Sequence, residues 1–459
     1  MTTATPLPAR PGVRPPAAWS FPVPEVFTLD NGLSVQTFHL PGQHVVSVRL
    51  GIPAPLAAEP VDVEGVATIL SRTLDEGTEA HDAEEMAGLL ERKGVFLGAG
   101  VGERGILVDL DVAVRNLGAG LELLTECLTT PTFPEEEVAR HVRNRIADIR
   151  HDLADPMSRA ALEFLPTYFR PSSRASRPSG GSLESVAAIT SEAVRAHHRR
   201  MVHPDRSHLV VAGDLTGVDV PALLGQTLSA WAPGGADEGA PPAGGDERAD
   251  DAARIVLVDR PGSVQTDLYL GCSGPDRRDP HGWGAYQVLS LAVGGSPQSR
   301  LDRVLREEKG YTYGVHAGFR PRTRGGLFLV SGSVRADATV PALDTLLDLL
   351  AMPGSDLTEA EVREAADFVA QTAPGRYATA DVLAGEAIGL AMDGLATDFV
   401  TRTLTQVRTM DAATAGAAWD AHVDGRWTVI AVGDAAAHGS AIEALGRGPV
   451  EVRRSGGRR

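Results

Sequence analysis

Two stretches of the sequence, HLVVAGDL at residues 208–215 and WTVIAVGDA at residues 427–435, decide the fold. Each stretch is a short apolar run that ends in Gly-Asp, which is typical of a buried strand followed by a turn. Asp214 and Asp434 are 220 positions apart. The same strand and turn therefore occur near the end of each half of the chain.

Two further landmarks repeat with nearly the same offset. The apolar strands SVRLG, ending at Gly51, and DLYLG, ending at Gly271, are also 220 positions apart. The helical segments EGVATIL and WGAYQVL, which contain Gly65 and Gly284, are 219 positions apart. Because three landmarks share almost one offset, the sequence predicts two copies of one fold.

Changes in composition place the boundaries of these copies. A proline-rich N-terminal segment, residues 1–24, lacks the apolar core of a secretory signal. Residues 232–253 are rich in Gly, Pro and Asp and show no periodicity, so we expect a flexible linker there. We therefore expect a first domain at 25–231, a second domain at 254–450 and a basic tail at 451–459.

Within each copy, strand and helix patterns follow one another without strict β-α-β order. Residues 25–39 predict a hairpin with Asp-Asn-Gly turn chemistry, and residues 45–51 alternate as a half-buried strand. Residues 64–76 and 82–93 carry apolar side chains at helical spacing. This order predicts an α+β fold of two homologous domains, each an antiparallel-rich sheet with helices packed on one face.

The overall composition argues against several classes of function. The chain of 459 residues has 43 basic and 60 acidic side chains, and a net charge of −17 disfavours binding to nucleic acid. No stretch approaches the roughly 20 apolar residues that cross a bilayer, so we expect no membrane partner. The two cysteines, Cys127 and Cys272, cannot build a disulfide framework, and we expect a cytoplasmic protein.

The thirteen histidines form no recognisable metal or catalytic motif. Neither His-Glu-x-x-His nor the inverted His-x-x-Glu-His occurs, and no Gly-x-Ser-x-Gly indicates a hydrolase nucleophile. His198, His203 and His208 are five positions apart and would point in different directions on a helix, so we expect solvated or capping side chains. Residues 197–200 predict a charged helix face.

The order of four segments resembles a known family. These segments are TLDNGLSV, EGVATILSRTLDEGT, LTTPTFPEEEV and SRLDRVLREEKGYTYGV. Together they resemble the pitrilysin or insulinase-type peptidases, in particular the bacterial and mitochondrial-processing-peptidase branch, and the resemblance extends over residues 24–450. It implies two homologous α+β domains per subunit, and two subunits that close around a chamber for an extended peptide.

The resemblance also identifies the positions of the family's zinc ligands. Active members read roughly Gly-x-x-His-x-x-Glu-His-x-x-x-x-Gly-Thr, in which two histidines at i and i+4 hold zinc and the glutamate activates water. Here Thr68 and Arg72 stand at the histidine positions and Ser71 at the glutamate position. The later ligand position falls at Asp148, or at Ala147 with a shift of one residue. These residues imply that the chain holds no metal.

The second half retains a different family pattern. Zinc-free subunits often carry Arg-x-x-x-Gly-x-x-Tyr, whose arginine and tyrosine bind the substrate peptide, and here these residues are Arg306 and Tyr313. Alternatively, Arg306 is a surface residue that pairs with Asp302, and Tyr313 packs on a strand. Tyr311, two residues earlier on the same predicted strand face, could be confused with Tyr313, and residues 294–295 lie where some members have a glycine-rich substrate loop.

The resemblance thus implies a non-catalytic, substrate-binding subunit of a heterodimeric zinc peptidase that cleaves extended peptides in a closed chamber. The partner subunit would carry zinc and His-x-x-Glu-His, and this chain would need no cofactor. Two alternatives stay open. One is a structural or interaction protein of the same fold with no role in peptide turnover, and the other is a metallopeptidase with an unorthodox metal site. A neighbouring reading frame of similar length with His-x-x-Glu-His would favour the heterodimer.

Overall fold

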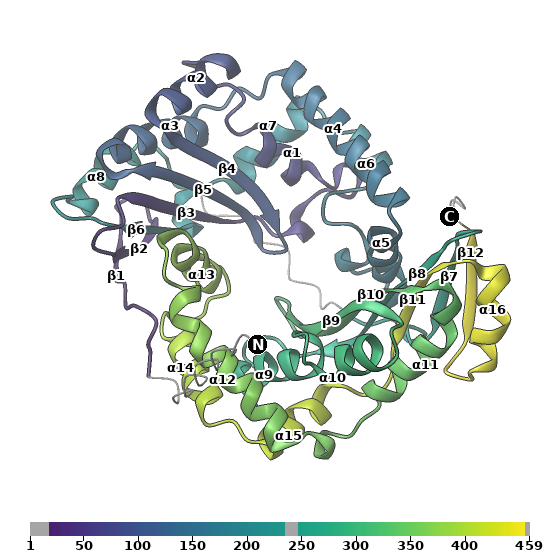
Figure 1. The fold of residues 1–459 in the computed structure, drawn as a ribbon. Coiled ribbons are helices and arrows are strands. Elements are labelled where there is room, and N and C mark those ends of the chain that lie inside the picture. Colours follow the sequence, from purple (N-terminus) through teal and green to yellow (C-terminus); the bar gives the residue numbers. More distant parts are fainter. Residues whose placement is uncertain (1–17, 235–246, 455–459) are drawn as a thin grey trace, which may run out of the picture.

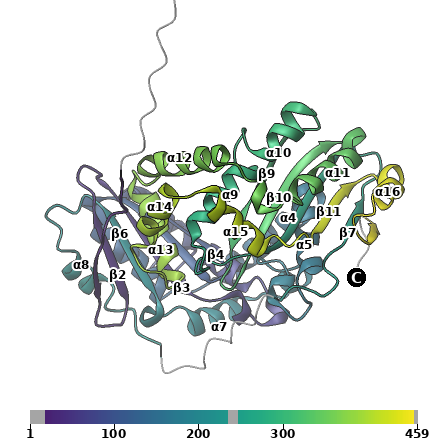
Figure 2. The same ribbon diagram turned by 90° about the horizontal axis from the view of Figure 1, so that it is seen from below.

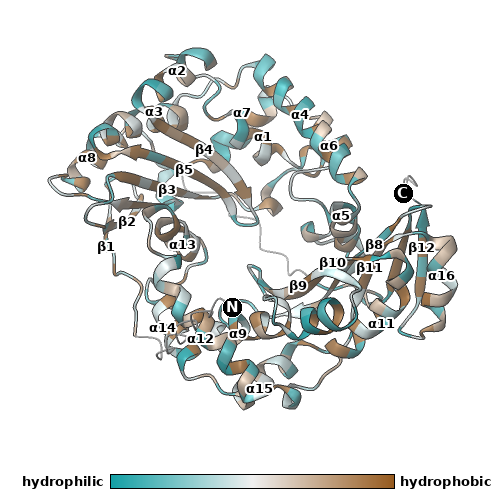
Figure 3. Cartoon of the chain, in the orientation of Figure 1, coloured by the Kyte–Doolittle hydropathy of each residue, from teal (hydrophilic) through white to brown (hydrophobic). Residues whose placement is uncertain are grey.

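The computed structural model describes residues 18–234 and 247–454. Two units face each other across the centre of the molecule, each built mainly from one half of the chain (Figure 1). Each unit is a six-stranded sheet with helices, so the predicted α+β class with two homologous domains is confirmed. The strands of both sheets are mainly hydrophobic, whereas the peripheral helices carry hydrophilic faces (Figure 3).

The first sheet has the strand order β1-β2-β6-β3-β5-β4. Its only parallel pair among the described strands is β2 with β6, and the other neighbours are antiparallel. The turn between β1 and β2 contains Gly32 at φ +87°, and Asn31 Nδ2 donates hydrogen bonds to the carbonyl oxygens of Leu228 and Trp231. The strands are β1 (Glu25–Thr28), β2 (Ser34–His39), β3 (Val45–Pro53), β4 (Val95–Gly102), β5 (Gly105–Ala113) and β6 (His208–Gly213).

The second sheet repeats this plan with the order β12-β7-β11-β8-β10-β9. The repeated sequence landmarks form β6 and β11, which occupy the same place in the two sheets. The parallel pairs among the described strands are β7 with β11 and β7 with β12. The strands are β7 (Ile255–Asp259), β8 (Gln265–Gly274), β9 (Thr312–Pro321), β10 (Gly326–Arg335), β11 (Thr428–Gly433) and β12 (Val450–Arg454).

Two segments form backbone pairs within parts of the chain that we expected to be a linker and a tail. Residues 451–454, assigned above to the basic tail, belong to β12 and pair with β7. Residues 247–253, assigned to the linker, return along the first half: the amide of Arg170 donates to the Glu247 carbonyl, and the amide of Ala249 donates to the Tyr168 carbonyl. Backbone pairing orders these segments although they carry few apolar side chains. The remainder of the predicted N-terminal segment, linker and tail, at 1–17, 235–246 and 455–459, lies outside the described residues.

Several helices begin at a side chain that accepts a hydrogen bond from an amide of the first turn. Asp82 and Glu85 form a capping box at the start of α2, and Gly94 ends this helix in a left-handed conformation. The helices of the first half are α1 (Val66–Thr73), α2 (Ala83–Lys93), α3 (Leu117–Thr129), α4 (Glu135–Ala154), α5 (Pro156–Tyr168), α6 (Leu183–Ala187), α7 (Ser191–Met201) and α8 (Val220–Thr227). Those of the second half are α9 (Trp283–Gly294), α10 (Arg300–Asp302), α11 (Thr339–Leu350), α12 (Glu359–Arg376), α13 (Ala380–Met392), α14 (Phe399–Arg408), α15 (Ala412–His422) and α16 (Ala435–Ala444).

Each half contributes one helix to the sheet of the other half. Helix α13 packs on β3 and β6 of the first sheet, and α5 packs on β8 and β11 of the second (Figures 1 and 2). The expectation that helices cover a single face of each sheet is therefore incomplete, because a helix from the other half lies on the second face. The two halves share buried apolar surface through this exchange.

The two repeated glycines explain how closely the exchanged helices approach. A Cβ atom at Gly51 would lie 2.7 Å from the Met392 sulfur of α13, and one at Gly271 would lie 2.5 Å from Cζ of Phe164 of α5. Both distances are shorter than van der Waals contact. A helix from the opposite half crosses the strand at each of these two positions, so only glycine leaves enough room there.

The chain also crosses between the halves before the first strand. Trp19 stacks on Tyr377 with ring centroids 5.7 Å apart, and Phe21 is buried with its amide donating to the Thr401 hydroxyl. Residues 18–24 thus fasten the start of the first half to the helices of the second. Among the described residues, no helix is both long and apolar enough to cross a membrane.

Candidate functional site: a substituted metal centre and a cavity between the halves

Helix α1 carries the first three candidate positions, and a buried carboxylate fixes where it starts. Gly65 precedes the helix at φ +98°, where a Cβ atom would lie 2.8 Å from the Gly180 carbonyl oxygen. Glu59 Oε1 accepts hydrogen bonds of 3.1 Å from the amides of Gly65 and Ala67. Its other oxygen accepts from Arg174 Nη2 at 2.9 Å. Burial raises the pKa of Glu59, and the bonds from Arg174 and the two amides oppose that rise.

The structure brings Arg72 and Asp148 together. Arg72 Nη1 lies 2.9 Å from Asp148 Oδ2 of α4, so a guanidinium from one ligand position pairs with the carboxylate from another. Ala147, the alternative at the later position, is exposed on the outer side of α4. Ser71 is buried, and its hydroxyl donates to the Thr68 carbonyl at 2.9 Å rather than facing a shared centre.

The chemistry of these side chains does not fit zinc. Neutral Thr and Ser hydroxyls are weak ligands, and the one carboxylate is already bound by a fixed cation. A second guanidinium lies close by: burial lowers the pKa of Arg145, and the charge of Arg72 lowers it further. In the part of the chain that the structure describes, no group of three or more His, Cys, Asp or Glu side chains could hold a metal ion.

The Arg306 and Tyr313 side chains both reach the surface. Arg306 lies in a π-helical turn, η6 (Arg303–Glu308), with 42% of its side chain exposed and Nε 3.4 Å from Glu307 Oε1. Tyr313, the second residue of β9, is 92% exposed. Asp302 does not pair with Arg306, because its Oδ1 accepts the Val315 amide at 2.9 Å. No hydrogen bond or ion pair joins Arg306 to Tyr313 within the described residues.

The two neighbouring candidates have structural roles instead. Tyr311 precedes β9 and packs against the core of the second half, so it does not share the exposed face of Tyr313. Gly294 ends α9 in a buried position, where a Cβ atom would lie 2.5 Å from the Ala317 Cβ. The glycine at 294 therefore lets α9 pack against β9.

The histidines of α7 are more buried than the sequence suggested. His197 is 3% exposed, and His198 Nε2 lies 3.0 Å from the Leu128 carbonyl oxygen. Burial lowers the pKa of both imidazoles to about 4, so they are neutral near pH 7. The prediction of a charged helix face is wrong for these two residues and holds for the exposed Arg199 and Arg200.

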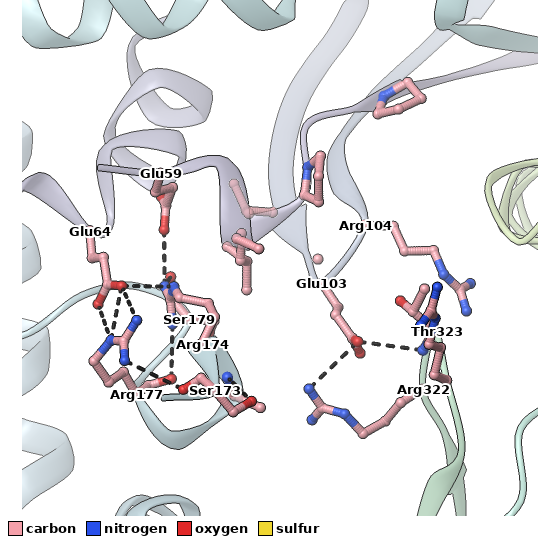
Figure 4. A pocket seen from close by; sticks show the side chains of 18 of the residues that line it. Glu59, Glu64, Glu103, Arg104, Ser173, Arg174, Arg177, Ser179, Arg322 and Thr323 are labelled. Carbon is pink, nitrogen blue, oxygen red and sulfur yellow. Dashed lines mark hydrogen bonds and ion pairs between the residues drawn. The ribbon is translucent and has the colours of Figure 1, made fainter. Parts of the chain in front are cut away.

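Sequence reasoning missed a cavity of about 1200 Å³ between the two halves. On one wall, Glu59 and Glu64 point toward Arg174 and Arg177; on the other, Glu103 points toward Arg322 (Figure 4). The arginine-rich composition was visible in the sequence, but nothing in it indicated that residues near 60, 104, 175 and 323 converge.

The comparisons with known proteins agree with this fold. A family model described as "Insulinase (Peptidase family M16)" matches residues 34–170, and one described as "Peptidase M16 inactive domain" matches residues 188–368. An uncharacterized zinc protease of Mycobacterium leprae is 29% identical over 339 residues, which cover 73% of this chain and 75% of that protein. An uncharacterized zinc protease of Streptomyces coelicolor is 28% identical over 315 residues, 67% of each chain.

Solved structures share the whole architecture. A peptidase M16 inactive domain from Pseudomonas fluorescens superposes with a TM-score of 0.82 at 24% identity, covering 90% of this chain and 98% of that one. A chain of complex III from Candida albicans gives 0.74 at 15% identity, covering 89% and 95%. Because the two family models together span both halves and the relatives are zinc proteases by name, the chain belongs to the insulinase (M16) peptidase family.

Proposed function

We propose that this chain is a non-catalytic subunit that holds an extended peptide for a zinc-bearing partner of the same family. The observation that carries the proposal is the ion pair between Arg72 and Asp148. The guanidinium lies 2.9 Å from the one carboxylate among the four proposed ligand positions, and a positive charge beside that carboxylate would oppose metal binding, which supports the proposal. The side chains of α1 and α4 thus keep the scaffold of the site without the donors that the chemistry requires.

The peptide-binding half of the proposal rests on the second sheet. An exposed tyrosine contributes little to folding, so the 92% exposure of Tyr313 leaves its side chain free for a ligand. Strand β9 is the last strand of its sheet, and one side of its backbone has no partner strand among the described residues. An extended peptide could add to this edge, with Arg306 and Tyr313 supplying polar contacts beside it.

The partner would supply the zinc chemistry. The relatives in Mycobacterium leprae and Streptomyces coelicolor are named zinc proteases, which supports a metal-dependent reaction within the family. The similarity to a chain of complex III supports the second candidate, a structural subunit with no role in peptide turnover. Peptide binding through Arg306 and Tyr313 separates the two candidates, because a purely structural subunit would not need it.

The test is reconstitution with a partner that carries His-x-x-Glu-His. In the complex, Arg306→Ala should raise KM for an extended peptide by roughly ten- to a hundredfold, since losing a charged hydrogen-bond partner costs about 1.5–3 kcal/mol. Tyr313→Phe should have a smaller effect, and kcat should fall less than KM rises. Arg303→Ala, in the same π-helical turn and 58% exposed, and Tyr311→Phe, two positions from Tyr313, are the matched controls.

Two results would contradict the proposal. Stoichiometric zinc in the purified chain, with chelator-sensitive cleavage by that chain alone, would show that it is itself a peptidase. Wild-type KM in both the Arg306→Ala and Tyr313→Phe complexes would favour the structural role.

A further inference from the structure

The cavity between the halves is closed on one side by the tips of two equivalent hairpins. The turn after β4 brings Glu103 to the turn after β9, where Glu103 Oε1 accepts the Thr323 amide at 3.4 Å and lies 3.5 Å from Arg322 Nη2 (Figure 4). The tip residue Arg104 reaches the other half and pairs with Asp393, which directly follows α13. The cavity is therefore built by both halves of the chain.

Positive charge exceeds negative charge on the walls of this cavity, although the chain as a whole carries −17. Seven arginines face five carboxylates there. The arginines are Arg104, Arg174, Arg177, Arg206, Arg278, Arg322 and Arg324, and the carboxylates are Glu59, Glu64, Glu103, Glu247 and Asp393. Every one of these carboxylates is already bound by a guanidinium: four by arginines of the cavity, and Glu247 by Arg170.

Two of these arginines, Arg278 and Arg324, make no ion pair within the described residues. Arg278 Nη2 donates to the backbone carbonyls of Asp393 and Gly394, and no ion pair of Arg278 occurs in the described part of the chain. Arg324, exposed at the tip of the β9–β10 hairpin, likewise makes no ion pair there. A guanidinium cannot lose its charge, so both side chains stay cationic. The carboxylate near them, Asp276, is bound to backbone: its Oδ1 accepts the Arg278 amide and its Oδ2 accepts the Gly325 amide.

The internal repeat places different residues against the two hairpin tips. Asp393 directly follows α13 and binds Arg104 from the hairpin tip of the first sheet. Phe169 directly follows α5, the equivalent exchanged helix, and the Arg322 guanidinium lies 4.9 Å from the centre of its ring. The first hairpin tip thus meets a carboxylate at the end of α13. The second tip meets an aromatic ring at the end of α5, pairs with Glu103 of the first tip and adds Arg324 to the cavity.

We propose that this cavity binds a carboxylate of a peptide, held by Arg278 and Arg324. A carboxylate accepts the paired donors of a guanidinium and would give these two arginines the ion pair that they do not make within the described residues. The apolar part of the lining, which includes Pro53, Leu56, Val101, Leu165 and Met392, offers contacts for the neighbouring side chains. That the ligand is a peptide rests on the proposed function, and the volume of about 1200 Å³ leaves room for several residues.

Binding to the full chain alone, measured by fluorescence anisotropy, tests the proposal. Three labelled peptides of one apolar sequence are compared: one with a free C-terminal carboxylate, one amidated, and one amidated with an internal glutamate. The free-acid peptide or the glutamate peptide should bind at least tenfold more tightly than the plain amide, and which of the two does so identifies the source of the carboxylate. Binding should weaken with added salt.

The double variant Arg278→Gln/Arg324→Gln should lose this preference and bind the carboxylate peptide roughly ten- to a hundredfold more weakly. Arg303→Gln, an exposed arginine of η6 that does not line the cavity, is the matched control and should bind like the wild type. If the double variant fails to fold by thermal melting, Arg324→Gln alone provides the test, because its side chain makes no ion pair within the described residues.

Equal binding of the three peptides, or unchanged binding by the arginine variants, would overturn the carboxylate site. Absence of binding by the wild-type chain would also overturn it. Each of these results leaves the heterodimer proposal intact, since that proposal is judged by KM of the reconstituted complex and by Arg306 and Tyr313. Conversely, a cavity that selects carboxylates stands even if no catalytic partner is found.

Discussion

Replacing Arg174 with methionine should strongly destabilise the first half of the molecule. The Glu59 side chain is 0% exposed and Arg174 only 11%, and their contact of 2.9 Å is the only charged bond that Glu59 makes among the described residues. Methionine keeps much of the length and apolar volume of the arginine but removes its charge. Glu59 would keep the amides of Gly65 and Ala67 and lose its counter-charge.

The expected size of the effect follows from this burial. Breaking a buried ion pair from one side costs about 3–5 kcal/mol. Because 1 kcal/mol shifts the melting temperature of a domain of this size by about 2–4 °C, Arg174→Met should lower it by roughly 6–20 °C near pH 8. Arg402→Met is the matched surface control, since both partners of its ion pair with Asp398 are 62% exposed and such pairs contribute at most about 1 kcal/mol.

The pH dependence makes the test specific to Glu59. Burial already raises the pKa of Glu59, and the Arg174 bond opposes this, so the pKa should rise further in Arg174→Met. A carboxyl whose folded-state pKa is raised loses stability as pH increases through that pKa. The deficit of Arg174→Met relative to wild type should therefore be larger at pH 8 than at pH 5. Adding Glu59→Gln to Arg174→Met should recover much of the loss at pH 8, because an uncharged amide replaces the unpaired carboxylate.

A pH-independent deficit, or a loss below about 1 kcal/mol at pH 8, would refute this reasoning. Either result would mean that Glu59 finds another counter-charge or water once Arg174 is removed. Glu64 would also lose a contact of 3.3 Å with Arg174 Nε in the variant, but it would retain its contact of 2.8 Å with Arg177, so Glu59 is the carboxylate left without a guanidinium.

Three further predictions follow from the fold and the substituted metal centre. The wild-type chain should contain no zinc by elemental analysis and should melt at the same temperature with and without a chelator. The quadruple variant Thr68→His/Ser71→Glu/Arg72→His/Asp148→Glu should bind zinc. If this variant folds but binds no zinc, α1 and α4 no longer hold the ligand geometry. Gly271→Ala should lower the free energy of unfolding by about 1–3 kcal/mol, and Gly51→Ala should lower it less. The reason is that a Cβ atom at Gly271 meets the rigid ring of Phe164, whereas one at Gly51 meets the flexible Met392 side chain. Melting temperatures equal to that of the wild type would contradict the close packing. Because the pKa of His197 and His198 is about 4 in the fold and about 6.5 when unfolded, stability should fall as pH drops from 6.5 to 4, by up to about 3 kcal/mol for each, and His197→Leu should reduce this dependence in urea titrations.

Much of the local structure could be predicted from the sequence. The period of apolar residues, the Asp-Asn-Gly turn and the acid-rich start of α4 each act over a few neighbouring residues, so they are readable without a tertiary structure. The strands and turns that repeat at an offset of 220 residues also predicted two copies of one domain. The identities of Thr68, Ser71 and Arg72 already ruled out the usual zinc ligands, because ligand chemistry depends on the residue types themselves.

The relation between the halves was decided only in three dimensions. An amphipathic helix must bury its apolar face, but its sequence does not say against which sheet, so the exchange of α5 and α13 could not be foreseen. The parallel pairing that draws residues 451–454 into β12 depends on backbone groups, which every sequence has.

The candidate sites divide in the same way. The resemblance in the sequence predicts which residues stand at the family's metal and peptide positions, and these assignments stay predictions. Only the tertiary structure decided that Arg72 meets Asp148, that Tyr313 is exposed while Tyr311 is packed, and that arginines from five distant segments line one cavity. The physical reason is that side-chain contacts and burial are set by elements far apart in the chain, whereas sequence patterns report mainly on neighbours.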